Sequence, residues 1–194
     1  LHKWRVGKRR VSSVTIDGRA QYVLVSSADV NELSSYNVAT GKLEFTLEGH
    51  GGGVHTLHST RDGLSVASSS NDQSVLTWLP DERIMSVRLE HQNAVSAVAI
   101  SNDSNRVLSG TEEGSVYLWN SEYAQLIEKK SPHTRRVSSC DMSPYGSLGA
   151  TASEDRTIRV WNMDKLQLLR TLRGHVLPVQ SIAFARRGDA VFSA

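Results

Sequence analysis

The chain repeats itself with a period of 41 or 42 residues. Four histidines mark the starts of successive repeats: His50, His91, His133 and His175. Three tryptophans, Trp78, Trp119 and Trp161, each lie 28 residues after the preceding histidine of this set. A fixed period of this length indicates that one small unit of secondary structure recurs and that neighbouring copies bury their faces against one another.

Each repeat predicts four short strands. An apolar strand follows each histidine and opens with a valine: Val54, Val95, Val137 and Val179. A strand of small residues, a polar turn and a strand ending in tryptophan come next, as in LGATASEDRTIRVW (148–161). An outer strand then leads to the next histidine, as in KLQLLRTLRGH (165–175). Four strands in about 42 residues is the period of a propeller blade, which predicts an all-β fold of four-stranded antiparallel blades.

These residues resemble the WD40-repeat family. The resemblance is carried by the pairs Gly49-His50 and Gly174-His175 and by the segment SEDRTIRVWN (153–162). The tryptophan–aspartate pair of the family appears as Trp119-Asn120 and Trp161-Asn162, with asparagine in place of aspartate. Because the resemblance covers essentially the whole chain, it implies a WD40 β-propeller.

The sequence predicts four blades and two part-blades of one propeller domain spanning residues 1–194. A weakened first repeat has Lys8 and Tyr36 in place of the histidine and tryptophan, and its string RRVSSV (9–14) returns as RRVSSC (135–140). The repeats run roughly over 7–48, 49–89, 90–131, 132–173 and, in part, 174–194, with 1–6 as the outer strand of a preceding blade. We expect an incomplete ring from a longer protein, because the two ends together lack a tryptophan-bearing strand.

The resemblance implies a hydrogen-bonded tetrad of histidine, Ser or Thr, aspartate and tryptophan inside each blade. Carried over by position, the sets are His50, Ser70, Asp72 and Trp78; His91, Thr111, Glu113 and Trp119; and His133, Ser153, Asp155 and Trp161. The longer carboxylate of Glu113 weakens the second set. Buried polar groups must be paired, so we interpret these residues as structural and not catalytic.

No catalytic, cofactor-binding or metal-binding residue is expected, and the chain does not read as an enzyme. The HGGG string at 50–53 resembles the oxyanion-hole turn of esterases, but no GxSxG nucleophile motif accompanies it. His55 and His58 stand where a later repeat has Ser138 and Asp141, which disfavours a histidine metal cluster. Cys140 is the single cysteine, which excludes an internal disulfide and indicates a reducing, intracellular location in the cytoplasm or nucleus.

The family resemblance favours a non-catalytic scaffold that mediates protein–protein interactions within a multi-subunit assembly. Loops on one face would form a rim that binds other proteins: Asn71, Asn93, Glu112, Arg135, Arg136 and Glu154. The alternative is a nucleic-acid-associated subunit of a ribonucleoprotein or chromatin complex, based on the basic strings at 1–10 and 129–136. The net charge of only +2 disfavours it. Neither a small-molecule substrate nor membrane insertion is expected, since no apolar run reaches the roughly 18–20 residues of a membrane span.

Overall fold

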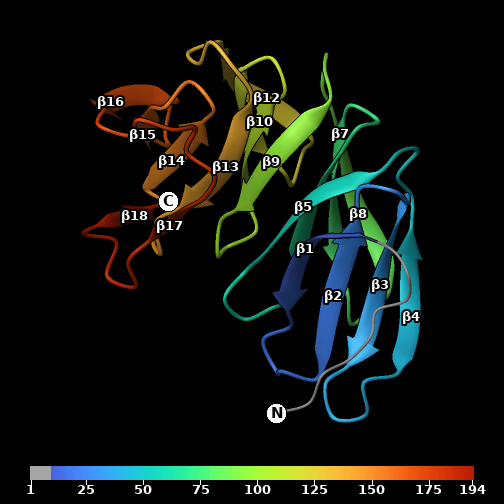
Figure 1. The fold of residues 1–194 in the computed structure, drawn as a ribbon. Coiled ribbons are helices and arrows are strands. Elements are labelled where there is room, and N and C mark those ends of the chain that lie inside the picture. The colour runs from blue at the N-terminus through green and yellow to red at the C-terminus, as the bar shows by residue number, and fades with distance from the viewer. Residues whose placement is uncertain (1–9) are drawn as a thin grey trace.

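The computed structural model describes residues 10–194, which form strands and turns arranged as successive antiparallel sheets (Figure 1). Blade 1 contains β1 (Val11–Ile16), β2 (Tyr22–Ser27), β3 (Glu32–Asn37) and β4 (Leu43–Glu48). Blade 2 contains β5 (Val54–Ser59), β6 (Val66–Ser70), β7 (Ser74–Leu79) and β8 (Ile84–Glu90). Blade 3 contains β9 (Val95–Ile100), β10 (Arg106–Thr111), β11 (Val116–Asn120) and β12 (Gln125–Lys130). Blade 4 contains β13 (Val137–Met142), β14 (Leu148–Ser153), β15 (Ile158–Asn162) and β16 (Gln167–Leu172), and a two-stranded sheet follows with β17 (Ile182–Phe184) and β18 (Val191–Ser193).

The predicted all-β architecture of four-stranded antiparallel blades is confirmed. The strands of each blade pair in chain order, and the described sheets form an arc that stays open between the β17–β18 sheet and blade 1 (Figure 1). The repeat boundaries remain a prediction, and the proposed strand at 1–6 lies outside the described residues.

The second strand of a blade is built from small residues because it is covered on both faces. The strand β6 reads VASSS and is buried throughout, as it lies between the neighbouring sheets. Gly110 of β10 shows how close the packing is: an added Cβ atom would lie within 2.5 Å of Val137 Cβ in the next blade. A larger side chain there must displace the neighbouring blade.

Hydrogen bonds between side chain and backbone join the first strands of adjacent blades and, after blade 4, join β13 to the segment that precedes β17. The residue after the opening valine donates from its hydroxyl to the corresponding valine carbonyl of the next blade. These bonds are Ser12 Oγ to Val54 O at 2.6 Å, Ser96 Oγ to Val137 O at 2.6 Å, and Ser138 Oγ to Val179 O. Blade 2 has His55 at this position, and its Nε2 lies 2.7 Å from Asn71 Oδ1 instead.

The turns between third and fourth strands are equivalent in all four blades. Each contains one residue with positive φ: Gly41, Arg83, Ala124 and Leu166. Each third strand also has a register shift next to its aromatic residue, at Tyr36, Trp78, Trp119 and Trp161. Tyr36 therefore occupies the tryptophan position of blade 1, as the period of the sequence predicts.

We expect the substitution Gly110→Ala to destabilise the protein by about 1–3 kcal/mol, because the new methyl group overpacks the junction of blades 3 and 4. Gly51→Ala is the matched control, since its added Cβ would meet only Asp72 side-chain atoms, at 3.7 Å or more. Urea denaturation measures both. Equal unfolding free energies for the two variants would contradict the packing described at Gly110.

Candidate protein-interaction site

A buried relay of hydrogen bonds links tryptophan, serine, histidine and aspartate in blade 2. The Nε1–H of Trp78 donates to Ser68 Oγ at 2.8 Å, and Ser68 Oγ lies 2.7 Å from His50 Nε2. His50 Nδ1 lies 3.0 Å from Asp72 Oδ2. The carboxylate can only accept, so Nδ1 carries the ring proton and Nε2 accepts from the serine hydroxyl. Every donor along this relay has an acceptor.

Blade 4 repeats the relay with threonine as the bridging residue. The Nε1–H of Trp161 donates to Thr151 Oγ1 at 3.0 Å, and Thr151 Oγ1 lies 2.9 Å from His133 Nε2. His133 Nδ1 is 2.9 Å from Asp155 Oδ2. The bridging hydroxyl therefore lies 18 residues after the histidine and ten before the tryptophan in both blades.

The bridging hydroxyl differs from the one that the family resemblance implies, which lies two residues later at Ser70 and Ser153. Ser70 Oγ instead donates to Gly53 O at 2.9 Å, and Ser153 Oγ donates to Arg135 O at 3.1 Å. Residues two apart in a strand face the same side, so both hydroxyl columns fit the pattern. The mid-strand hydroxyl reaches the indole, whereas the hydroxyl at the strand end binds the adjoining loop.

The last sheet repeats the spacing of the bridging hydroxyl. His175 Nε2 lies 2.9 Å from Ser193 Oγ, again 18 residues later. With Ser109 Oγ 2.7 Å from His91 Nε2, the spacing of 18 recurs in four histidine–hydroxyl pairs. The column 20 residues after the histidine also holds a hydroxyl at Ser70, Thr111 and Ser153, so spacing alone does not separate the two columns.

Blade 3 has a shorter network that does not include the predicted Thr111 and Glu113. His91 Nδ1 donates to Leu89 O at 3.0 Å, while its Nε2 accepts from Trp119 Nε1 at 3.2 Å and lies 2.7 Å from Ser109 Oγ. Thr111 Oγ1 accepts from the Ser115 backbone N–H at 3.1 Å, and Glu113 is exposed in the turn. The aromatic ring of Tyr117 packs against the His91 ring instead, with centroids 4.6 Å apart.

Burial lowers the pKa values of the histidines in these networks, and hydrogen bonding lowers those of the aspartates. Burial opposes ionisation of Asp72, but hydrogen bonds from Ser74, Gly51 and His50 outweigh it and lower the pKa of this carboxyl to about 2. Asp155 has the same balance and a pKa of about 2. Burial lowers the pKa of His91 to about 4, against an ordinary value of 6.5, and it also lowers the pKa values of His50 and His133. These three histidines are therefore neutral structural groups at pH 7.

The same carboxylates fix the loops at one end of the blades. Asp72 Oδ2 accepts from the Gly51 backbone N–H at 2.7 Å, and Asp155 Oδ2 accepts from the Thr134 N–H at 3.2 Å. In three blades a backbone hydrogen bond also joins the turn between the second and third strands to the loop that precedes the first strand. These bonds are Asn71 N to Gly53 O at 3.0 Å, Glu112 N to Ala94 O at 3.1 Å, and Glu154 N to Arg136 O at 3.0 Å. The two segments that hold the predicted rim residues therefore lie together at this end.

The predicted rim residues differ in their exposure to solvent and in their side-chain partners. Arg135 and Asn71 are exposed, although the Asn71 side chain bonds to His55. Asn93 and Glu154 are partly exposed. Arg136 Nε lies 3.2 Å from Glu112 Oε1, and this ion pair bridges blades 3 and 4 with both side chains about one-third exposed. The rim thus combines open side chains with a pair that joins neighbouring blades.

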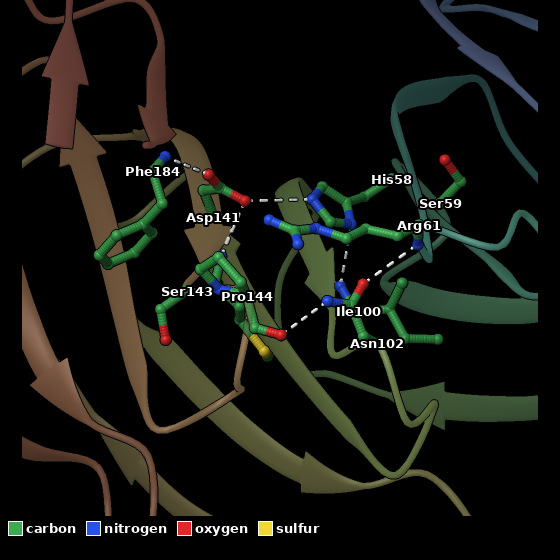
Figure 2. A pocket seen from close by; sticks show the side chains of 10 residues that line it. His58, Ser59, Arg61, Ile100, Asn102, Asp141, Ser143, Pro144 and Phe184 are labelled. Carbon is green, nitrogen blue, oxygen red and sulfur yellow. Dashed lines mark hydrogen bonds and ion pairs between the residues drawn. The ribbon is translucent and has the colours of Figure 1, made fainter. Parts of the chain in front are cut away.

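A cavity of about 190 Å³ lies at the opposite end, beside a histidine–aspartate pair that the sequence analysis missed (Figure 2). Figure 2 shows His58 and Asp141 pointing toward one another, with His58 Nε2 3.2 Å from Asp141 Oδ1. His58 Nδ1 accepts from the Ile100 N–H at 3.3 Å, and Asp141 Oδ2 accepts from the Phe184 N–H at 2.6 Å. Both ring nitrogens are engaged, so the pair joins strands and leaves no free nitrogen for proton transfer or a metal.

Three further properties of the part of the chain that the structure describes concern metal-binding clusters, the reactivity of its thiol and membrane-spanning helices. Residues 10–194 contain no group of three or more His, Cys, Asp or Glu side chains that could hold a metal ion. Cys140 is buried, which raises the pKa of its thiol. None of these residues belongs to a helix long and apolar enough to cross a membrane.

Comparison with known proteins identifies the family. The family described as "WD domain, G-beta repeat" matches residues 41–78, 83–120 and 125–162, which is more than half of the chain. The chain belongs to the WD40-repeat family. Each matched WD40 unit begins near the outer strand of one blade and ends at or next to the tryptophan of the next blade.

Curated WD40 relatives have varied names. The chain is 27% identical over 88% of its length to the U5 small nuclear ribonucleoprotein 40 kDa protein of Dictyostelium discoideum, covering 49% of that protein. It is 33% identical over 53% of its length to the human WD repeat and SOCS box-containing protein 1, covering 25% of it. It is 23% identical over 95% of its length to periodic tryptophan protein 2 of Arabidopsis thaliana, covering 21% of it. The chain thus spans half or less of these relatives' lengths.

A double-mutant cycle distinguishes the two hydroxyl columns. We expect Ser68→Ala and Trp78→Phe to show a coupling energy of about 1 kcal/mol or more, because the indole N–H and the serine hydroxyl share a buried hydrogen bond. Ser70→Ala with Trp78→Phe should show a coupling near zero. The cycles are measured by urea denaturation, and a larger coupling for Ser70 would overturn the assignment of Ser68.

The lowered histidine pKa values predict that acid weakens the fold. Between pH 6.5 and about 4, the unfolded chain binds a proton at His91 that the folded protein excludes, so the unfolding free energy falls as the pH falls. Below pH 3.8, protonation of the two carboxylates in the unfolded chain continues the loss down to about pH 2. Urea titrations from pH 7 to 4.5 should show a smaller slope for His91→Gln, whereas Leu24→Val, a core change without a titrating group, should retain the full slope. Identical slopes for both variants would contradict a buried neutral His91.

Proposed function

We propose that this chain is part of a non-catalytic scaffold that binds other proteins through its rim, within a multi-subunit assembly. The observation that carries the proposal is the repeated bond between turn and loop in three successive blades, which gathers the rim side chains at one end. Membership of the WD40 family supports it, because propellers of this family are known mostly as interaction platforms.

The physical basis of the proposal is a rim whose backbone is fixed and whose side chains face solvent. Because Asp72 and Asp155 anchor the loops from inside, a partner need not order them, and less binding free energy is lost to conformational entropy. Arg135 offers a planar donor group on an apolar stem, a combination favoured at the centres of protein interfaces.

The alternative, a nucleic-acid-associated subunit, has support from the name of the Dictyostelium relative, a component of a ribonucleoprotein. The basic residues near the rim favour a protein partner instead. Lys129 binds Gln92 and lies 5.1 Å from the centre of the Tyr117 ring, and Arg136 is paired with Glu112. Phosphate contacts need free cations, and in the described part of the string at 129–136 only Lys130 and Arg135 are basic and exposed.

We expect Arg135→Ala with Glu154→Ala to reduce recovery of bound proteins without altering the fold, since exposed substitutions change stability by no more than about 0.5 kcal/mol. The measurement is affinity purification of the tagged intact protein after nuclease treatment, with quantitative mass spectrometry of bound proteins. Glu44→Ala with Arg170→Ala, two exposed charges on outer strands, is the matched control. Unchanged recovery with the rim variant and lost recovery with the control would move the binding face to the blade edges. Loss of recovered protein on nuclease treatment alone would favour the nucleic-acid alternative.

A further inference from the structure

The junctions between blades are sealed differently at the end opposite the rim. Between blades 3 and 4, Met163 and Leu166 of the β15–β16 turn are fully buried. An added Cβ on Gly149 would overlap the Met163 sulfur and lie 3.0 Å from Leu108 of blade 3, so Met163 fills the space between the two blades. These two side chains act as a wedge under the junction.

Blade 3 has small residues at the same two positions. Ser121 is equivalent to Met163, since each donates its backbone N–H at 3.0 Å to the turn between the first two strands, at Asn105 and Ser147 respectively. Ala124 is equivalent to Leu166, with φ values of 50° and 48°. The junction between blades 2 and 3 therefore lacks the wedge.

A cavity of about 270 Å³ occupies this place, lined in part by Ser121 and Glu122 of blade 3. Its apolar wall is formed by Trp78, Leu79, Val87 and Ile100. A cavity of about 150 Å³ lined by apolar side chains is large enough to hold benzene, so this space can take one methionine or leucine side chain. We call it the wedge groove.

The charged residues beside the two junctions also differ. Asp164 pairs with Arg106 at 3.4 Å beside the wedge of blade 4, and Arg106 also donates to Met163 O at 3.0 Å. The residues equivalent to this pair at the wedge groove are Glu122 and Ser65. The carboxylate is therefore kept while the arginine is lost, and among the described residues Glu122 is the only charged one that lines the groove.

We propose that the wedge groove docks a segment of a partner protein that inserts a methionine or leucine side chain and presents an arginine to Glu122. Such a segment supplies what blades 3 and 4 together supply at the next junction: the apolar wedge of Met163 and Leu166 from blade 4, and the guanidinium of Arg106 from blade 3 beside a carboxylate. The site lies at the opposite end from the rim, so it is a second binding surface and does not depend on the function proposed for the rim.

The test uses fluorescence polarisation of the intact protein with a fluorescein-labelled hexapeptide, Ser-Arg-Gly-Met-Leu-Gly. Saturable binding is expected. Filling the groove with Ser121→Met and Ala124→Leu should weaken binding at least about tenfold. Glu122→Arg should reverse the preference, so that a peptide with glutamate in place of arginine binds more tightly. The rim variant Arg135→Ala with Glu154→Ala is the matched control and should bind the original peptide like the unmodified protein, which separates failure at this site from failure at the rim.

Three results would overturn the proposal. The first is the absence of saturable binding, and the second is a dissociation constant that changes less than about twofold in both groove variants. The third is concentration-dependent self-association, measured by sedimentation, that filling the groove abolishes, because it would assign the groove to a second copy of this chain. If the filled variant fails to fold, the charge reversal at Glu122 decides alone.

Discussion

The hydrogen-bonded networks centred on His50, His91 and His133 are the interaction on which the rest of the structure depends. An unpaired buried donor or acceptor costs about 1–3 kcal/mol, so each network is stable only when its strands and loops stand in one register. In blades 2 and 4 the network continues to a carboxylate that holds the rim loops by their backbone. The same bonds that specify the blade therefore pre-form the surface proposed to bind partners.

The two ends of the blades use different physical means to join neighbours. At the rim, hydrogen bonds and the Arg136–Glu112 pair link loops whose side chains stay polar and exposed. At the opposite end, the apolar side chains of Met163 and Leu166 fill the junction of blades 3 and 4, whereas Ser121 and Ala124 hold the equivalent positions at the junction of blades 2 and 3. The variation leaves the wedge groove between blades 2 and 3, whereas Met163 and Leu166 close the next junction.

The sequence predicted what depends on periodicity: the strands, the blades and the aromatic column that includes Tyr36. It misplaced the bridging hydroxyl because Ser68 and Ser70 share one face of a strand, and only contact with the indole separates them. It missed the contact between His58 and Asp141 because these residues lie 83 positions apart, on blades 2 and 4. It kept Glu113 in a network where Tyr117 packs instead, since a carboxylate at the aspartate position of the repeat does not show whether it reaches the histidine ring. The repeat period of the sequence therefore predicts the fold, whereas the residues that depart from the repeat can be placed only from their side-chain contacts.

The most direct test of the central role of the network is hydrogen–deuterium exchange on Asp155→Ala. This substitution removes the carboxylate that accepts from the Thr134 and Thr157 backbone N–H groups and from His133. We expect faster exchange in the rim loops of blade 4, with the amides that pair β15 and β16 still protected as in the unmodified protein. Unchanged exchange in the rim loops would show that the buried network does not hold the rim, and would contradict the account.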